Sequence, residues 1–521
     1  MHIKNKNQIY LLAINVALVF FLIFFSNIGM LPFGKGDFAF FAFLTFLVAL
    51  FRPSWGFLFF FGTMVLENIN LAPTDFGIAV RPYQLLGGLT ILSLTARFFT
   101  RRLSFSLIKF TIFDWAAILL GMGSLLSIAN APMKEASLKQ VIIMISYIVL
   151  YFLVRNFLQT KEDLKKVLPF FLSSSIVVVF YAIWQNIQFL QGGNHFEVMP
   201  GRPNATFTEP DWLGIYLSLL LALVYSLIFY FYKKKDDSLE DSQISNFKFP
   251  IIKTELFLFL VMVYIALIIT VARSAWLGAF FVTFIFLFAA FTQLKVNYGF
   301  WQWKETFKLK MKIALAFILS LVVVYAFQLT NFQLINRIQS TGSGQQRITV
   351  SCVEEKLLES KEWDDKSLQE AGCRHINLEE IEKEKMAGNF IQEVYRKDPN
   401  INIRSEIYAK SWEIIKNHPF LGIGWGSVSS FLGKDAQGNG LNASNIFLEV
   451  WLGAGMLGLA AFVFLLFGAL RNGIYFFAKQ DRFFGMFILL GLVAVIVPNL
   501  FNSGIFLGFL WVFLGLAFIK K

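Results

Sequence analysis

Charged residues are scarce in this 521-residue chain, in which Asp, Glu, Lys and Arg together make up 15% of the sequence. Soluble proteins carry charges on about a quarter of their residues. Hydrophobic residues make up 56% of the chain, and Phe alone occurs 63 times. The lack of charge excludes an ordinary water-soluble domain, and the excess of apolar side chains indicates that lipid surrounds most of the chain.

Short segments of alternating polarity, which are typical of a membrane β-barrel, are missing too. Apolar runs of about seventeen to twenty-two residues recur instead, each long enough to cross about 30 Å as a helix. The sequence therefore predicts an all-α fold, a polytopic integral membrane helical bundle of about 12–14 transmembrane helices with a large extracytoplasmic loop. The expected spans, several of which are shorter than this, cover residues 9–25, 38–51, 55–66, 83–94, 114–128, 141–154, 168–190, 213–232, 256–272, 275–294, 313–329, 445–470, 484–497 and 505–519.

The net charge of +12 does not form one basic surface, because Lys and Arg lie between the apolar runs. A nucleic-acid binder would cluster them, so we expect no nucleic acid as a partner. With the N-terminus inside, the short inner loops and tails hold 26 Lys and Arg and the short outer loops hold six. The positive-inside rule then predicts a multi-pass protein of the bacterial plasma (inner) membrane with both termini cytoplasmic.

Potential metal ligands are few. The four histidines are His2, His195, His375 and His418, and none stands at a metal-ligand spacing from another His, Cys or Asp. We therefore expect no metal and no cofactor.

The two cysteines, Cys352 and Cys373, fall in the long outer loop, where a disulfide is permitted, but their spacing leaves both a disulfide and two thiols open. No small-x-small cleavage site follows the first apolar run, so we expect it to stay as a helix.

The expected division of the chain has three parts: N-terminal transmembrane helices over residues 1–329, a long extracytoplasmic loop over 330–443, and C-terminal transmembrane helices over 444–521. Within the loop, Asn377 and Glu380 form a capping-box pattern that predicts a charged helix over 378–397. A second, amphipathic helix is expected over 403–417. The glycine-rich run Leu421–Gly426 is not a nucleotide site, because no strand precedes it and no Gly-Lys-Ser follows.

Two arginines stand at the outer mouths of apolar helices, where charge is costly and often functional. Arg273 lies in a bare turn between two long runs, and Arg202 lies in a loop with Glu209 and Asp211. Each arginine fits either an interfacial anchor or an anion-binding group, because a guanidinium matches phosphate oxygens. Asp211 stands where it would complement a helix dipole. Glu209 is better placed to act as a base.

Three blocks of residues resemble the O-antigen ligase and polymerase superfamily of membrane glycosyltransferases. They are Gly201–Gly214, Thr270–Gly278, and a stretch from Arg404 through Asn417–Gly426 to Gly458. In the last block the family has a catalytic His, then Asn, nine residues and Gly-x-x-Gly. Here Asn445 is followed by nine residues and Gly455-Met-Leu-Gly458, but Ser444 occupies the position of the histidine.

The resemblance implies transfer of a glycan from undecaprenyl pyrophosphate to an acceptor hydroxyl on the extracytoplasmic face. The expected partners are the undecaprenyl-pyrophosphate-linked donor, a glycolipid, glycan or protein acceptor, and the lipid bilayer. By position, Arg202 and Arg273 would bind the pyrophosphate, with Arg404 as a third candidate. Fixed cations would stabilise the charge that develops on the leaving group without a metal.

Ser444 cannot accept a proton at neutral pH as an imidazole can, and it fits the N-cap of a helix that starts at Asn445. Three interpretations therefore stay open. Glu209 or His418 supplies the base, the transfer needs no strong base, or the protein no longer transfers. We expect an active ligase. A polymerase of the same superfamily, a flippase or transporter of lipid-linked oligosaccharide, and a scaffold of the same fold are the alternatives.

Overall fold

The computed structural model describes residues 5–103, 106–193, 201–233, 253–298, 303–329, 345–353, 363, 365–376, 381–397, 399–434 and 440–519. The chain forms two compact units. The first contains Met1–Phe327 together with Ser411–Lys521, and the second contains Gln328–Lys410. Residues 411–443 of the expected long loop therefore belong with the membrane helices.

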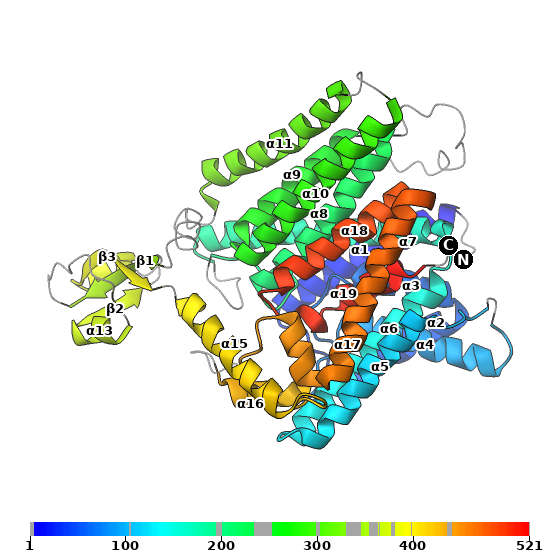
Figure 1. The fold of residues 1–521 in the computed structure, drawn as a ribbon, viewed down its shortest axis with the longest axis horizontal. Helices are drawn as coiled ribbons and strands as arrows, with labels where there is room; N and C mark the ends of the chain where they lie inside the picture. Colours follow the sequence, from blue (N-terminus) through cyan, green and yellow to red (C-terminus); the bar gives the residue numbers. More distant parts are fainter. Residues whose placement is uncertain are drawn as a thin grey trace. The chain divides into compact units, whose positions relative to one another are not determined.

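Every apolar run singled out in the sequence corresponds to one helix of the first unit (Figure 1). These helices are α1 (Asn5–Asn27), α2 (Lys35–Phe51), α3 (Pro53–Thr63), α4 (Pro82–Phe99), α5 (Ile112–Ser127), α6 (Lys134–Phe157), α7 (Lys161–Leu190), α8 (Pro210–Lys233), α9 (Lys253–Ile269), α10 (Arg273–Tyr298), α11 (Trp303–Ala326), α17 (Ile446–Tyr475), α18 (Arg482–Asn499) and α19 (Gly508–Ala517). Short helical segments between them are η1 (Thr74–Phe76), η2 (Ile128–Asn130), η7 (Trp425–Ser427), α16 (Val428–Leu432), η8 (Phe476–Gln480) and η9 (Gly504–Phe506).

Within the described residues, nine helices are long and apolar enough to cross a membrane. The outward faces are apolar as well: Phe280, Phe284 and Phe288 recur every four residues along α10 and are 62%, 58% and 63% exposed. A row of exposed phenylalanines is unfavourable in water but favourable against lipid chains. The protein is a polytopic helical membrane protein, as the sequence predicts.

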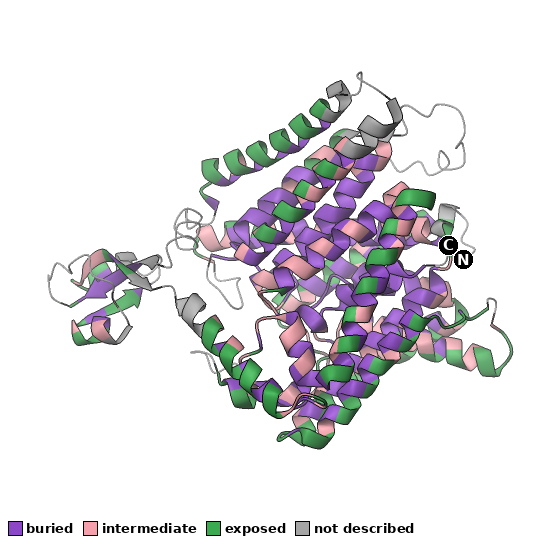
Figure 2. Cartoon of the chain, viewed as in Figure 1, coloured by how far each residue is buried: buried purple, intermediate pink, exposed green. Residues whose placement is uncertain are grey.

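α8 lies in the interior of the first unit, where 89% of its most apolar stretch is buried. α8 packs against α9, α10 and α18, and α17 packs against α5 and α18. Figure 2 shows buried residues along these helices where they pack together and exposed residues on their other faces. On α5, Gly123 lies so close to α17 that an added Cβ would stand 2.7 Å from the Ala454 carbonyl oxygen. Small residues at such contacts let two membrane helices approach closely.

The second unit is built on a three-stranded antiparallel sheet with the strand order β2-β1-β3. Its strands are β1 (Gln345–Cys352), β2 (Cys373–Ile376) and β3 (Phe390–Lys397), and its short helices are α13 (Asp365–Glu370) and α14 (Ile381–Met386). Six buried residues form its core: Ile348, Val350, Cys352, Leu368, Cys373 and Val394. α15 (Pro399–Asn417) begins in this unit and ends in the first, and it contains the amphipathic helix expected over 403–417.

The predicted charged helix over 378–397 is wrong. Residues 377–380, which carry the capping-box pattern, lie outside the described residues, and the rest forms α14 and the strand β3. β3 pairs with β1 so that Val394 stands opposite Ile348 and is buried. Pairing with a distant strand therefore outweighs the local helical pattern, because it buries apolar side chains of both strands.

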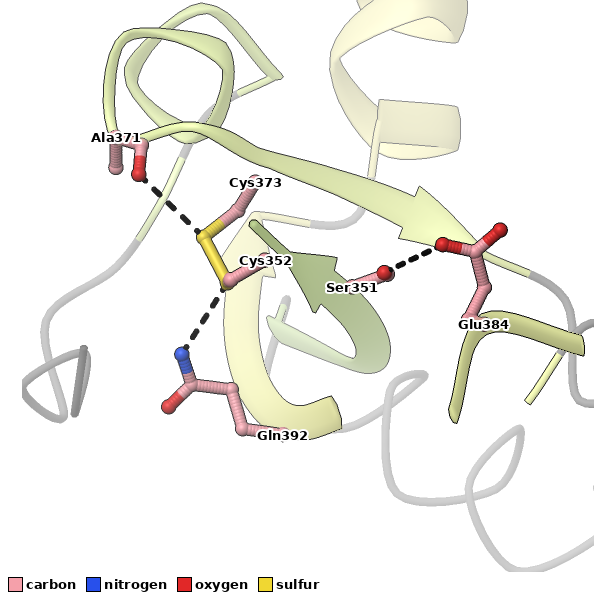
Figure 3. The surroundings of a disulfide bond; sticks show 6 residues. All are labelled: Ser351, Cys352, Ala371, Cys373, Glu384 and Gln392. Atoms are coloured by element: carbon pink, nitrogen blue, oxygen red, sulfur yellow. Dashed lines mark hydrogen bonds between the residues drawn. A yellow bond between two sulfur atoms is a disulfide. The ribbon is translucent and has the colours of Figure 1, made fainter. Parts of the chain in front are cut away.

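The two cysteines form a disulfide (Figure 3). Cys352 and Cys373 stand directly opposite each other on β1 and β2, with their Cα atoms 4.1 Å apart. Beside the bond, Glu384 accepts hydrogen bonds from Ser351 Oγ at 2.7 Å and from Arg374 Nη2 at 2.6 Å. The disulfide and this carboxylate therefore tie β1 and β2 together and join them to α14.

Candidate functional site

The loop before α8 holds Arg202 in a buried position, with 6% of its surface exposed. Its Nε donates a hydrogen bond of 2.8 Å to the carbonyl oxygen of Thr270, and its Nη2 lies 3.2 Å from Oδ2 of Asp211. Asp211 belongs to the first turn of α8. Arg202 therefore joins the start of α8 to the turn between α9 and α10.

That turn presents Arg273 at the first position of α10. Val271 has a φ of 51°, which is strained for a β-branched residue and persists only where the surroundings hold it. The bond from Arg202 to Thr270 is one such constraint. Three residues of chain span at most about 11 Å, so the Arg202 contact lies close to the backbone of Arg273. Two cationic groups singled out from separate motifs thus lie in one region.

Glu209 directly precedes Pro210, the first residue of α8. Its carbonyl oxygen accepts hydrogen bonds from the backbone N–H groups of Trp212 and Leu213, both at 3.1 Å. The residue is partly exposed and stands two positions before Asp211, the ion-pair partner of Arg202. The structure therefore places Glu209 at the same end of α8 as Arg202.

The connection between α18 and α19 links the turn at Arg273 to the start of α17. Asn502 donates from Nδ2 to Oγ of Ser274 at 2.9 Å, and Ser274 directly follows Arg273. On the other side, the next residue, Ser503, donates to Oδ1 of Asn442 at 3.1 Å. Asn445 Nδ2 donates to the carbonyl oxygen of Leu500 at 3.1 Å. The connection between α18 and α19 thus contacts both the turn at Arg273 and the residues at the start of α17.

Ser444 stands directly before α17 with a φ of 48°, in the left-handed region that few non-glycine residues adopt. It is not the helix N-cap, so that expectation is wrong. Asn445 has this role, and its Oδ1 accepts hydrogen bonds from Phe447 N at 2.9 Å and Leu448 N at 3.2 Å. An asparagine side chain satisfies the first amides of a helix as well as a serine does, and the preceding residue is then left outside the helix.

A further carboxylate lies beside Ser444. Glu449, in the first turns of α17, is 6% exposed, and its Oε2 accepts a hydrogen bond of 2.7 Å from the backbone N–H of Ala443. Ser503 Oγ lies 3.4 Å from the same oxygen. Glu449 is not among the residues expected from the sequence, because it lies inside an apolar run. A charged residue in such a run was the signal that could have found it.

The segment after α3, which contains Val65 and the buried Glu67, contacts two loops near the candidate site. The segment after α3 accepts a hydrogen bond from Thr206 Oγ1 at the carbonyl oxygen of Val65, 2.6 Å away. In the same segment, Glu67 accepts from the backbone N–H of Gly508 and pairs with Arg81 at 3.2 Å. Burial raises the pKa of the Glu67 carboxyl, against the opposing effect of Arg81. The loop that contains Arg202 and the start of α19 are thus both hydrogen-bonded to the segment after α3.

His418 directly follows α15, in a segment that contacts α17. Its backbone N–H donates to the carbonyl oxygen of Ile414 at 2.9 Å, and its carbonyl oxygen accepts from Gly422 N at 3.1 Å, so its backbone forms the turn after α15. The same segment contacts α17 at Leu452, where Ile423 N donates to the carbonyl oxygen at 2.8 Å. About 12 Å of helix separates Leu452 from the residues at Ser444. No described contact joins the His418 side chain to the arginines.

α17 is broken at Gly455, whose φ of 68° and ψ of −172° are non-helical. Unpaired backbone groups at membrane depth are costly and need partners within the protein. Here Met456 N donates to the carbonyl oxygen of Phe420 at 3.1 Å, and Trp451 Nε1 donates to that of Pro419 at 2.9 Å. The residues that follow His418 therefore supply hydrogen-bond partners at the break in α17.

Arg404 lies on α15 in the second unit and is partly exposed. Its role as a third pyrophosphate-binding group stays a prediction. His195 lies outside the described residues. In the part of the chain that the structure describes, no group of three or more His, Cys, Asp or Glu side chains could hold a metal ion.

A family model described as O-antigen ligase matches residues 256–463. Over these residues the chain is similar to O-antigen ligases. The matched O-antigen ligase segment contains the Arg273 turn, Ser444 and the break at Gly455, whereas Arg202 and Glu209 precede it. Arg202 nevertheless contacts the O-antigen ligase segment through Thr270. No curated protein matches the chain.

Proposed function

We propose that the protein transfers a glycan from undecaprenyl pyrophosphate to an acceptor hydroxyl on the extracytoplasmic face of the bacterial plasma membrane. The observation that carries the proposal is the bond between Arg202 and Thr270, because it brings two arginines from separate loops to the start of α10. A departing pyrophosphate gains negative charge, and fixed guanidinium groups stabilise that charge in a region poor in water.

The position of Arg273 supports an anion-binding role. Arg273 is the first residue of α10, where the positive end of the helix dipole and unpaired amide groups favour an anion. Arg202 is buried and already contacts Asp211 and Thr270. We infer that Arg273 contacts the pyrophosphate directly. Arg202 would fix the turn between α9 and α10 through Thr270 and add a second positive charge near the site.

The charge distribution supports an outward-facing site. The opposite ends of the same helices carry cations: Lys233 ends α8, Lys253 begins α9 and Arg482 begins α18. The positive-inside rule places those ends in the cytoplasm. The turn at Arg273, at the other end of α9, is then extracytoplasmic, where assembled lipid-linked glycans are used.

The test is transfer by the purified full-length chain in proteoliposomes that contain an undecaprenyl-pyrophosphate-linked oligosaccharide and a hydroxyl-bearing glycolipid acceptor. We expect R273A to lower the release of undecaprenyl pyrophosphate at least 100-fold, as expected for loss of a transition-state charge contact. R97A is the matched control, because Arg97 stands at the other face of the predicted topology and contacts backbone carbonyls. Turnover of R273A within twofold of the unmodified protein would refute the proposal.

The same assay separates a ligase from a polymerase. A ligase requires the added acceptor and attaches one donor glycan to it, whereas a polymerase lengthens the donor glycan when only donor is present. We expect acceptor-dependent release without lengthening. Movement of intact donor across the bilayer, without release of undecaprenyl pyrophosphate, would instead identify a flippase.

A further inference from the structure

Glu449 is a buried carboxylate that contacts both the residue before Ser444 and the connection between α18 and α19. It lies in the first turns of α17, follows Ser444 by five residues and is 6% exposed. A charged side chain is rarely buried unless it is paired or has a function. No described Lys, Arg or His forms an ion pair with Glu449, so an ion pair does not explain why this carboxylate is buried.

The hydrogen bonds of Glu449 place its carboxylate beside Ser444. Oε2 accepts from the backbone N–H of Ala443, the residue before Ser444, at 2.7 Å. Ser503 Oγ contacts the same oxygen at 3.4 Å. Within the described residues, these bonds reach only Oε2. A carboxylate bonded through one oxygen keeps lone pairs on the other, which is what a proton acceptor requires.

Two adjacent residues connect this carboxylate to the arginine turn. Ser503 contacts Glu449, and Asn502 donates to Oγ of Ser274, the neighbour of Arg273. The Glu449 carboxylate and the turn that carries Arg273 thus both contact one short connection. Group transfer to a hydroxyl needs both: one to take the proton and one to hold the leaving group.

We propose that Glu449 is the general base of the transfer, an inference that rests on the proposed function. The acceptor hydroxyl attacks the anomeric carbon of the donor glycan, and its proton passes to Oε1 of Glu449. The bond from the anomeric carbon to the pyrophosphate oxygen breaks, and undecaprenyl pyrophosphate leaves with the electron pair beside Arg273. Ser444 has no role as a base, because a serine hydroxyl does not accept a proton at neutral pH.

The alternative role for Glu449 is structural, because its carboxylate also satisfies the Ala443 N–H and complements the helix dipole. E449Q separates the two roles. Glutamine keeps an oxygen that accepts the hydrogen bond but cannot take a proton. A structural role predicts transfer close to that of the unmodified protein, whereas a base predicts a loss of kcat of about 100-fold to 10,000-fold with an unchanged KM for the donor.

The experiment compares the unmodified protein, E449Q, S444H and the double variant S444H/E449Q in the proteoliposome assay, with pH profiles of kcat. We expect E449Q to lose transfer and S444H/E449Q to regain at least tenfold, because an imidazole at position 444 would stand next to the missing base. The acidic limb of the S444H/E449Q profile should lie near pH 6.5, the ordinary pKa of histidine.

Three results decide the inference. E449Q with a kcat within threefold of the unmodified protein would overturn it while leaving the proposed function intact. Absence of transfer by the unmodified protein would show that the proposed function itself has failed. If glutamine prevents folding, E449D replaces it: withdrawal of the carboxylate by about 1.5 Å should lower kcat more than tenfold without a change in KM, and a smaller loss would count against a base.

Discussion

Nε of Arg202 donates a hydrogen bond of 2.8 Å to the carbonyl oxygen of Thr270, a residue 68 positions further along the chain. Its Nη2 pairs with Asp211 at 3.2 Å. The guanidinium therefore uses two of its nitrogens in different directions, one for a neutral carbonyl and one for a carboxylate. The planar fork of an arginine has this geometry, and the ammonium of a lysine does not.

R202K should therefore impair the protein although the charge is kept. Lysine can reach only one of the two acceptors, which leaves either the Thr270 carbonyl or the Asp211 carboxylate without its partner. We expect a loss of about 1–3 kcal/mol in stability and a fall in transfer of at least tenfold. Thermal unfolding in detergent and the proteoliposome assay measure the two effects.

R97K is the matched control for this substitution. The guanidinium of Arg97 also binds backbone carbonyls, from Nε to Leu50 at 3.0 Å and from Nη2 to Phe51 at 2.9 Å, and neither partner is charged. We expect R97K to keep full transfer. If R202K and R97K behave alike, Arg202 contributes charge alone and its bond to Thr270 does not position the site.

The break in α17 gives a second prediction. Gly455 has a φ of 68°, and a Cβ at this position would stand 2.1 Å from the carbonyl oxygen of Phe420. G455A therefore meets both backbone strain and a clash with backbone atoms that cannot move far. We expect it to destabilise the chain by more than about 2 kcal/mol, measured as a lower midpoint of thermal unfolding.

The control for G455A is G88A. Gly88 lies within α4, and nothing stands within 4 Å of a Cβ built there. Alanine in a helix that accepts it stabilises by about 0.4–1 kcal/mol. A raised or unchanged midpoint for G88A beside a lowered midpoint for G455A is the expected pair of results. Equal midpoints would mean that the break is not required.

The helices of the first unit could be predicted from the sequence because lipid imposes a strong local pattern. A run such as Ile313–Leu329 must be apolar throughout its length to cross the membrane, so composition alone locates it. Strand β3 could not be predicted in this way. Its residues Phe390–Lys397 carry charges that suit a helix surface, and their strand conformation depends on pairing with β1, about 45 residues earlier.

Only part of the candidate site could be predicted from the sequence, because long-range contacts leave no local pattern. Arg202 and Arg273 stand out locally, since each is an arginine at the end of an apolar run. The contributions of Asn502 and Ser503 depend on contacts with residues more than fifty positions away, which no local pattern records. Glu449 was hidden because a single acid inside an apolar run does not alter the prediction of a span.

The disulfide gives a third prediction. Cys352 and Cys373 are separated by 21 positions, and a closed loop of this length stabilises by about 3 kcal/mol in the chain-entropy model. The variant C352S/C373S should therefore lose hydrogen-exchange protection in β1 and β2. Amides of α8 in the same full-length protein serve as the control, since they belong to the other unit. A loss of protection that extends to α8 would show that the two units unfold together.

The last prediction concerns the response of the sheet to acid. Hydrogen bonds from Ser351, Asn389 and Arg374 lower the pKa of Glu384 to about 2 from an ordinary value of 4.5. A carboxyl whose pKa is lower in the folded state than in the unfolded state stabilises the fold fully when the pH is above the unfolded pKa. Its contribution is lost as the pH falls towards the folded value. Protection of the β1 and β2 amides, corrected for intrinsic exchange rates, should therefore decline between about pH 4.5 and pH 2.

E384Q tests the origin of this decline. Glutamine does not titrate, so the protection of E384Q should be lower at pH 6 and should vary less below pH 4.5. E370Q is the matched control, because Glu370 is an exposed acid on α13 in the same unit, and it should keep the pH dependence of the unmodified protein. If E384Q and the unmodified protein lose protection in parallel, another acid governs the response, since only Glu384 differs between the two chains.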